Sequence, residues 1–159
     1  MANITLITVG TLKEDYLKSA VLEYKKRISK YARVDEVEIK EERIANEDDE
    51  SEITRALYTE GEKILAAVPK GAVKIALCIE GKQYTSPELA GLISNELDKS
   101  GRIALIIGSS HGLSSTVKSA CDVHLSVSKL TFPHQLMRPI LLEAIYRSFT
   151  IIAGKKYHK

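Results

Sequence analysis

Apolar residues along this chain alternate between short continuous runs and longer stretches with helical spacing. The short runs, rich in β-branched or other apolar residues, predict strands over residues 3–9, 34–39, 73–79, 103–107 and 123–127. The second run, V-D-E-V-E-I, alternates apolar and acidic positions, so it predicts a half-exposed strand near an edge of the sheet. The third and fourth, VKIALCI and IALII, are almost wholly apolar and predict strands covered on both faces.

Apolar positions three or four residues apart predict a helix after each strand. These helices cover residues 12–31, 52–68, 86–99, 115–120 and 131–153. Ser86-Pro87 supplies an N-cap followed by proline at the first helical position, and Thr85 with Glu88 offers an alternative capping box. Gly101 is expected to end the third helix.

The second helix and the segment before it carry most of the acidic residues. Residues 40–50 lack an apolar pattern, so we expect a mobile loop there. Within the helix over residues 52–68, Gly61 is expected to be a weak point. The expected buried stripe consists of Ile53, Leu57, Ile64 and Leu65.

Strands and helices therefore alternate along the whole chain. This order is typical of an α/β fold with a mostly parallel sheet flanked by helices. No linker, repeat or low-complexity segment interrupts residues 1–159, so we expect a single domain. There is no apolar run of about 18 residues, and residues 1–10 lack the basic region and cleavage site of a signal peptide, so we expect a cytoplasmic protein.

Charge is unevenly distributed, although the net charge is only +2. Residues 35–62 hold twelve acidic and three basic residues, whereas residues 63–159 are basic. The basic part could contact a polyanion such as RNA, or its charges could simply be solvated. Cys78 and Cys121 lie far apart in apolar stretches and are expected to be reduced, buried thiols. The histidines show no metal-ligand spacing, so no metal site is expected.

Ligands of parallel α/β sheets bind at the carboxyl ends of the strands. The loops expected there cover residues 80–81, 108–112 and 126–131. None of them contains a dinucleotide fingerprint, a P-loop or a nucleophile elbow. Two of the loops contain glycine, which lets the backbone approach a ligand closely, so backbone groups could hold a nucleoside.

Four segments carry a resemblance to a known family: IALIIGSSHGL, LSVSKLTFPHQLMR, LLEAIYRSF and the terminal GKKYHK. Together with the opening ITLITVGTLKEDYLKSAVLEYKKRI, they make the whole chain resemble the ribosomal RNA large-subunit methyltransferase H family of the SPOUT superfamily. The resemblance implies a C-terminal trefoil knot, S-adenosylmethionine as cofactor and a homodimer. It further implies methylation of N3 of a pseudouridine in 23S rRNA, on the assembled 70S ribosome.

The resemblance also implies a set of site residues. Those implied for cofactor binding are Leu77, Gly108, Val127, Ser128, Lys129, Leu130, Thr131 and Phe132. Read alone, Leu77 suits an ordinary core position and Gly108 an ordinary turn. An imide nitrogen must lose its proton before it attacks, so a catalytic base or a group that stabilises the anion is expected, and Tyr157 and His158 in the tail are the candidates. The alternative for such a tail is disorder.

Residues 134–147 leave several interpretations open. Arg138 suits a phosphate or the cofactor carboxylate, and His134 either holds the loop or contacts substrate. Arg147 and Glu143 are expected to form a structural pair four residues apart. Pro139 predicts a kink in the last helix or a later start. That helix is apolar nearly all around, so it must be covered on all sides, either by a partner subunit or within one chain.

One residue departs from the family's pattern, and two alternative functions stay open. His111 is unusual for the family's loop, and we assign it no catalytic role. The alternative function is a non-catalytic, ribosome-associated RNA-binding module with a vestigial cofactor pocket. A flavodoxin-like nucleotide or signalling domain is a second alternative, but its signalling form needs acidic residues clustered at strand ends, and only Glu80 qualifies.

Overall fold

The computed structural model describes residues 1–157 and shows strands and helices in strict alternation. The strands are β1 (Ala2–Val9), β2 (Ala32–Ile39), β3 (Val73–Gln83), β4 (Arg102–Ile107) and β5 (Val123–Ser126). The helices are α1 (Asp15–Ile28), α2 (Glu50–Ala67), α3 (Ser86–Ser100), α4 (Ser115–Ala120) and α5 (Met137–Ile152). Within this described part, no helix has the length and apolar character needed to cross a membrane.

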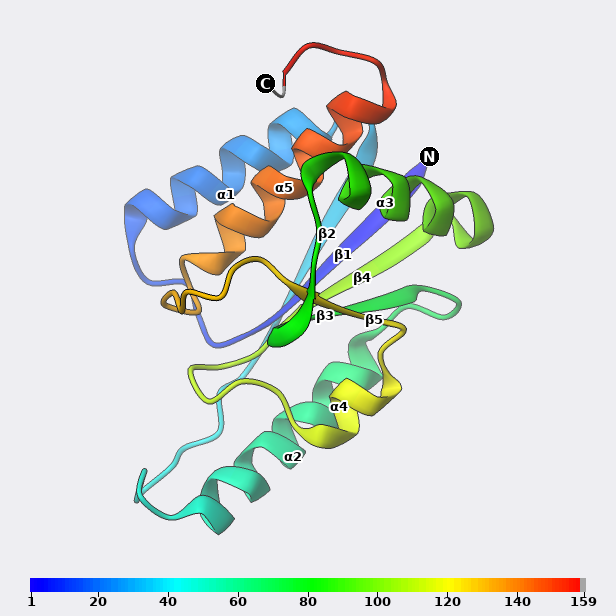
Figure 1. Cartoon of the computed structure of the whole chain (residues 1–159). Coiled ribbons are helices and arrows are strands. Elements are labelled where there is room, and N and C mark those ends of the chain that lie inside the picture. Colours follow the sequence, from blue (N-terminus) through cyan, green and yellow to red (C-terminus); the bar gives the residue numbers. More distant parts are fainter. Residues whose placement is uncertain (158–159) are drawn as a thin grey trace.

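The strands form one parallel sheet in the order β2-β1-β4-β3-β5. This confirms the predicted α/β class, and β2 does lie at an edge. The apolar strands β1 and β4 occupy the interior of the sheet, where helices cover both of their faces (Figure 1). The trefoil knot implied by the resemblance stays a prediction.

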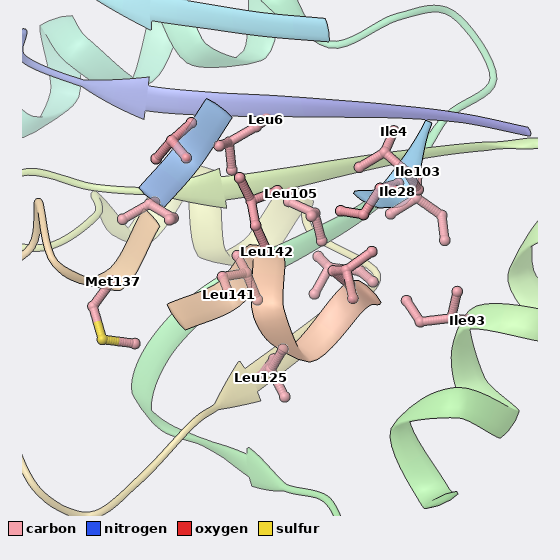
Figure 2. Packing of buried hydrophobic residues seen from close by; sticks show 14 of the residues in the cluster. Ile4, Leu6, Ile28, Ile93, Ile103, Leu105, Leu125, Met137, Leu141 and Leu142 are labelled. Carbon is pink, nitrogen blue, oxygen red and sulfur yellow. The ribbon is translucent and has the colours of Figure 1, made fainter. Parts of the chain in front are cut away.

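Helices α1, α3 and α5 cover one face of the sheet, and α2 and α4 cover the other (Figure 1). Because side chains alternate along a strand, Leu6 and Leu105 point toward the first group of helices. Figure 2 shows these two side chains close to Leu141 and Leu142 of α5. On the opposite face, residues such as Ile106 pack with α2 and α4.

The last helix begins later than residue 131, where the apolar pattern placed its start. It starts at Met137, so Pro139 lies in the first turn, where a missing backbone N–H disrupts no helical hydrogen bond. The later start, one of the two outcomes predicted from Pro139, is therefore confirmed. Helix α5 lies between α1 and α3 against the sheet, so its apolar sides are covered mainly within one chain. Its composition consequently gives no independent support for a dimer.

Strand β3 extends beyond the predicted end at residue 79 and includes the expected loop at residues 80–81. Its end pairs with β5 after a register shift between Leu77 and Lys82. A side chain at Gly81 would lie 2.7 Å from the backbone of His124, so only glycine allows this close approach. Ile79 is 53% exposed, so β3 is not covered on both faces along its whole length.

Helix ends and the buried stripe of α2 also differ from the predictions. Helix α1 is shorter at both ends than residues 12–31, and α3 uses the alternative capping box of Thr85 and Glu88. The buried residues of α2 are Ala56, Glu60, Gly61 and Ile64, so only Ile64 of the predicted stripe is fully buried. The stripe is shifted because α4 and the loop before it pack on the Glu60–Gly61 side of α2.

Gly61 permits close packing between α2 and α4 and is not merely a weak point of the helix. A Cβ atom at position 61 would lie 2.7 Å from Ser114 Oγ and 2.8 Å from Val117 Cγ2. Ser114 cannot easily move, because its hydroxyl accepts the Val117 backbone N–H and caps α4. The close contact between the two helices therefore requires glycine here.

We predict that Gly61→Ala lowers the free energy of unfolding by about 1–2 kcal/mol, because overpacking outweighs the gain in helix propensity. The matched control is Gly91→Ala in α3, where a Cβ atom meets nothing within 4 Å. This control should gain up to about 1 kcal/mol. Urea denaturation measures both, and equal stabilisation by the two substitutions would contradict the packing argument.

Candidate active site

A cavity of about 610 Å³ lies at the carboxyl ends of β3, β4 and β5. Its volume lies within the usual range for a small-molecule site, about 300–1,000 Å³. Three chain segments form most of its wall: the end of β3 at residues 77–80, the loop at 107–113 and the segment at 126–134. They include the three loops that the sequence pattern placed at this edge of the sheet.

Most of the residues implied for cofactor binding come together around this cavity. The predicted residues that line it are Leu77, Gly108, Val127, Ser128, Leu130, Thr131 and Phe132. Lys129 belongs to the same loop but is exposed and does not line the cavity. The residues predicted from the sequence therefore include at least one in each of the three segments of the wall.

Gly108 belongs to a tight loop in which a larger residue has no room. A Cβ atom at position 108 would overlap the backbone of Gly112. The loop is closed by a hydrogen bond of 2.9 Å from the Gly112 N–H to the Ser109 carbonyl, and Gly112 itself has a φ of 86°. Glycine at both positions therefore shapes this wall of the cavity.

The segment after β5 is held by short-range hydrogen bonds and presents apolar side chains. The Ser126 hydroxyl donates to the Ser128 carbonyl at 3.1 Å, and the Leu130 N–H donates to Ser128 Oγ at 3.0 Å. Leu130 and Phe132 stay 71% and 38% exposed although they are large and apolar. Such apolar surface at a cavity is available to contact a ligand.

Gln135 and Arg138 anchor this segment to the first strand. The Gln135 side-chain amide donates to the Thr11 carbonyl at 3.1 Å and accepts the Lys13 N–H at 3.2 Å. Arg138 is 1% exposed, and its guanidinium donates to Glu38 Oε2 at 2.7 Å and to the carbonyls of Val9 and Gly10. These contacts direct its two terminal nitrogens toward β1 and β2, whereas Nε has no hydrogen-bond partner among the described residues, and contact with a phosphate or the cofactor carboxylate stays a prediction.

His134 directly precedes Gln135 and lines the cavity. Its Nε2 is buried and has no hydrogen-bond partner among residues 1–157. Burial lowers the pKa of the imidazole, Glu41 opposes this effect, and Arg138 adds to it. His134 is therefore a neutral cavity-wall residue at neutral pH, with a ring nitrogen that a ligand could pair.

The tail residue Tyr157 packs on α5 and does not line the cavity of its own chain. Its hydroxyl donates to Glu143 Oε2 at 3.0 Å, and its ring contacts Tyr146 edge-on with centroids 4.9 Å apart. Arg147 Nε donates to Glu143 Oε1 at 2.8 Å, which confirms the expected structural pair. Burial and Glu143 raise the pKa of Tyr157. His158, the other tail candidate, lies outside the described residues.

Several cavity residues were not selected from the sequence. Cys78, Lys118 and Met137 line the cavity, as does His111, which was noticed only as unusual. Lys118 comes from α4, which no sequence motif connects to the site. Cys78 and Cys121 are half-buried rather than buried, and burial raises the pKa of Cys121 to about 11.

The wall suits a nucleoside joined to an amino acid, as in S-adenosylmethionine. Apolar side chains such as Leu77, Ile107 and Phe132 provide surface for a flat base, and Ser109, Ser128 and Thr131 provide hydroxyl groups. The unpaired Nε2 of His134 adds a buried polar position. This mixture of apolar walls and a few polar groups is typical of small-molecule sites and is compatible with a nucleoside.

Comparison with known proteins defines the class to which this sheet and cavity belong. A family model described as "Predicted SPOUT methyltransferase" matches residues 2–158, so the protein is a SPOUT methyltransferase. The solved structure of a probable methyltransferase from Bordetella pertussis Tohama I has the same fold, with a TM-score of 0.58. The two chains are 16% identical, and the match covers 92% of this chain and 96% of that one.

Relatives with higher sequence identity show to which family of SPOUT methyltransferases the chain belongs. The ribosomal RNA large subunit methyltransferase H of Clostridium novyi is 49% identical over 158 residues, with 99% of both chains covered. The enzyme of that name from Caldicellulosiruptor saccharolyticus is 44% identical over 156 residues, with 98% of this chain and 99% of that one covered. The chain therefore belongs to the ribosomal RNA large-subunit methyltransferase H family. S-adenosylmethionine is the methyl donor of SPOUT methyltransferases.

We predict that Arg138→Met lowers the free energy of unfolding by about 3 kcal/mol, because it removes the guanidinium donor from two backbone carbonyls and from Glu38, which keeps only the Leu12 N–H. Urea denaturation measures the loss. The control is Lys99→Met, which removes an exposed pair with Glu96 and should change stability by less than about 0.5 kcal/mol. Similar effects of the two substitutions would show that Arg138 is not the anchor described above.

The lowered pKa of His134 predicts a pH-dependent stability. The unfolded chain binds a proton at this residue at higher pH than the folded chain, so the contribution is present above about pH 6.5 and is lost as the pH falls. From pH 7.5 to 5.5, the protein should lose up to about 1 kcal/mol relative to His134→Gln. Glu60, whose pKa is raised mainly by burial, titrates in both proteins and cancels in the difference. A pH-independent difference would contradict the prediction.

Proposed function

We propose that this protein methylates N3 of a pseudouridine in 23S rRNA with S-adenosylmethionine, on the assembled 70S ribosome in the cytoplasm. The observation that carries the proposal is the single cavity formed by Leu77, Gly108 and residues 127–132 in a chain that matches ribosomal RNA large-subunit methyltransferases over nearly its full length. A small protein with few RNA-binding elements needs the assembled particle to present its target.

The proposed reaction requires a base as well as a methyl donor. S-adenosylmethionine supplies a methyl group on a positively charged sulfur. The imide N–H of the target must lose its proton, and we assign His158 of the tail as the candidate base and Tyr157, whose raised pKa keeps it protonated, as a group that stabilises the anion. Tyr157 is held against α5 of its own chain, away from the lining of that chain's cavity, so it can serve a site only across a homodimer interface.

Neither Arg138 nor Lys129 lines the cavity, so the proposal gives each of them an indirect role. Arg138 supports catalysis by positioning the segment that bears His134, through its contacts with Glu38, Val9 and Gly10. Lys129 belongs to the proposed cofactor loop, where its exposed side chain faces solvent and the backbone contributes to the loop.

Labelled methyl transfer to assembled ribosomes tests the function, with separated subunits as the comparison. We expect incorporation into 23S rRNA of the 70S particle and much less into the free large subunit. Calorimetry with S-adenosylmethionine separates the methyltransferase from a non-catalytic RNA-binding module. Absence of binding would exclude the enzyme, whereas binding to ribosomes without transfer would favour a non-catalytic RNA-binding module with a vestigial pocket.

We predict that Gly108→Ala weakens S-adenosylmethionine binding at least about tenfold, because the added Cβ forces the 108–112 loop out of its closed form. Isothermal titration calorimetry measures the affinity, and circular dichroism checks that the fold is retained. Gly91→Ala, a substitution on an open helix surface, should leave the affinity unchanged. Unaltered binding by Gly108→Ala would place the cofactor elsewhere.

A further inference from the structure

An acidic segment borders the cavity without forming its wall. We call residues 40–49, which connect β2 to α2, the acidic arm (Figure 1). Glu47 Oε1 lies 3.9 Å from Nε2 of the cavity residue His111. Glu41 Oε2 lies beside Gly10, 3.4 Å from the position that a Cβ atom would take there, and its charge opposes the lowering of the pKa of the cavity residue His134. The arm therefore brings negative charge near two separate parts of the cavity.

Hydrogen bonds hold the acidic arm in place. The Glu42 N–H donates to the buried carboxylate of Glu60 at 2.9 Å, and Lys63 pairs with Glu42 at 3.0 Å. Further along, the backbone N–H groups of Ala45 and Asn46 donate to Glu52. The carboxylates of Glu41 and Glu47 are thus carried by a tethered backbone and contribute a steady local field.

The cavity lining does not cancel this field. Its charged residues are Glu80 and Lys118, which form an ion pair with each other at 2.5 Å. The rest of the lining consists of apolar, hydroxyl, thiol and glycine residues together with His111 and His134, and the pKa of His134 is lowered mainly by burial. Outside the lining, the arm adds the carboxylates of Glu41 and Glu47, Lys129 adds a positive charge on the exposed side of the 126–131 loop, and the guanidinium of Arg138 is paired with Glu38.

We propose that Glu41 and Glu47 make the cavity discriminate by charge, favouring the sulfonium methyl donor over the uncharged thioether product. The inference rests on the proposed function. On transfer, the carbon–sulfur bond breaks with its electron pair left on sulfur, a carbon–nitrogen bond forms to N3, and the N3 proton leaves to the base. S-adenosylhomocysteine thus carries one positive charge fewer than S-adenosylmethionine, and the fixed field of the arm attracts it less.

The size of the effect follows from Coulomb's law. Two unit charges about 10 Å apart, in surroundings between protein surface and water, change an affinity by a factor of roughly two to ten. Glu47 is 77% exposed, so solvent screening places it at the lower end of this range. We expect about a threefold contribution to the ratio of affinities from each carboxylate. This preference speeds product release and limits inhibition by the product.

Isothermal titration calorimetry of the full chain with S-adenosylmethionine and with S-adenosylhomocysteine tests the proposal. The variants are Glu41→Gln, Glu47→Gln and the double variant. The control is Asp98→Asn, which removes the same charge from the exposed end of α3, where β4 begins. The ratio of the product Kd to the donor Kd should fall about threefold in each single variant and further in the double variant, with no change in Asp98→Asn. Salt at about 0.5 M should shrink the wild-type ratio in the same direction.

The proposal is overturned if the ratio does not respond to the charges of the arm, or if it responds equally to the control substitution. If the ratio is unchanged in the double variant, or if both affinities change equally, the arm does not discriminate by charge. If Asp98→Asn shifts the ratio as much, net charge rather than the arm is responsible. In these cases the proposed function stands, because both ligands bind. Failure of the wild-type protein to bind either ligand would overturn the proposed function, and this inference with it.

Discussion

The buried guanidinium of Arg138 ties the C-terminal part of the chain to the ends of the first two strands. It joins Glu38 of β2 and the carbonyls of Val9 and Gly10 to the first turn of α5. The chain leaves β5 at one edge of the sheet and returns to α5 next to α1, so the segment between them must cross over β3 and β4. Because Arg138 and Gln135 fix the far end of that segment, residues 126–134 can form one wall of the cavity.

Close backbone packing shapes the wall of the cavity that follows β4 and the helix contact beside it. Gly108 lets the loop after β4 fold back on Gly112, and Gly61 lets α2 approach the start of α4. These positions connect the packing of the α2–α4 face with the shape of the cavity, since the 108–114 loop leads directly into α4. The packing of α2 on α4 and the shape of the cavity wall are therefore linked through adjacent residues of one loop on this side of the sheet.

Charge is arranged by tertiary contacts around a nearly neutral cavity. The acidic segment that looked like a mobile loop is hydrogen-bonded to α2 through Glu52 and Glu60. The tail, in contrast, is attached to α5 through Tyr157 and the Glu143–Arg147 pair. The acidic arm thus lies beside the cavity, whereas the tail with Lys155 and Lys156 lies on α5, away from the lining of that cavity.

The sequence alone determined the α/β class, the order of the elements and most of the cavity loops. Apolar periodicity and capping residues act over a few positions, and the run LSVSKLTFPHQLMR carried the family resemblance. Only the tertiary structure decided which way Arg138 points, why Gly61 is needed, how far β3 extends and where Tyr157 packs. The Arg138–Glu38 contact joins residues 100 positions apart, and the Gly61–Ser114 contact joins two different helical regions. Such contacts depend on how distant segments pack, which no local pattern of apolar and polar residues records.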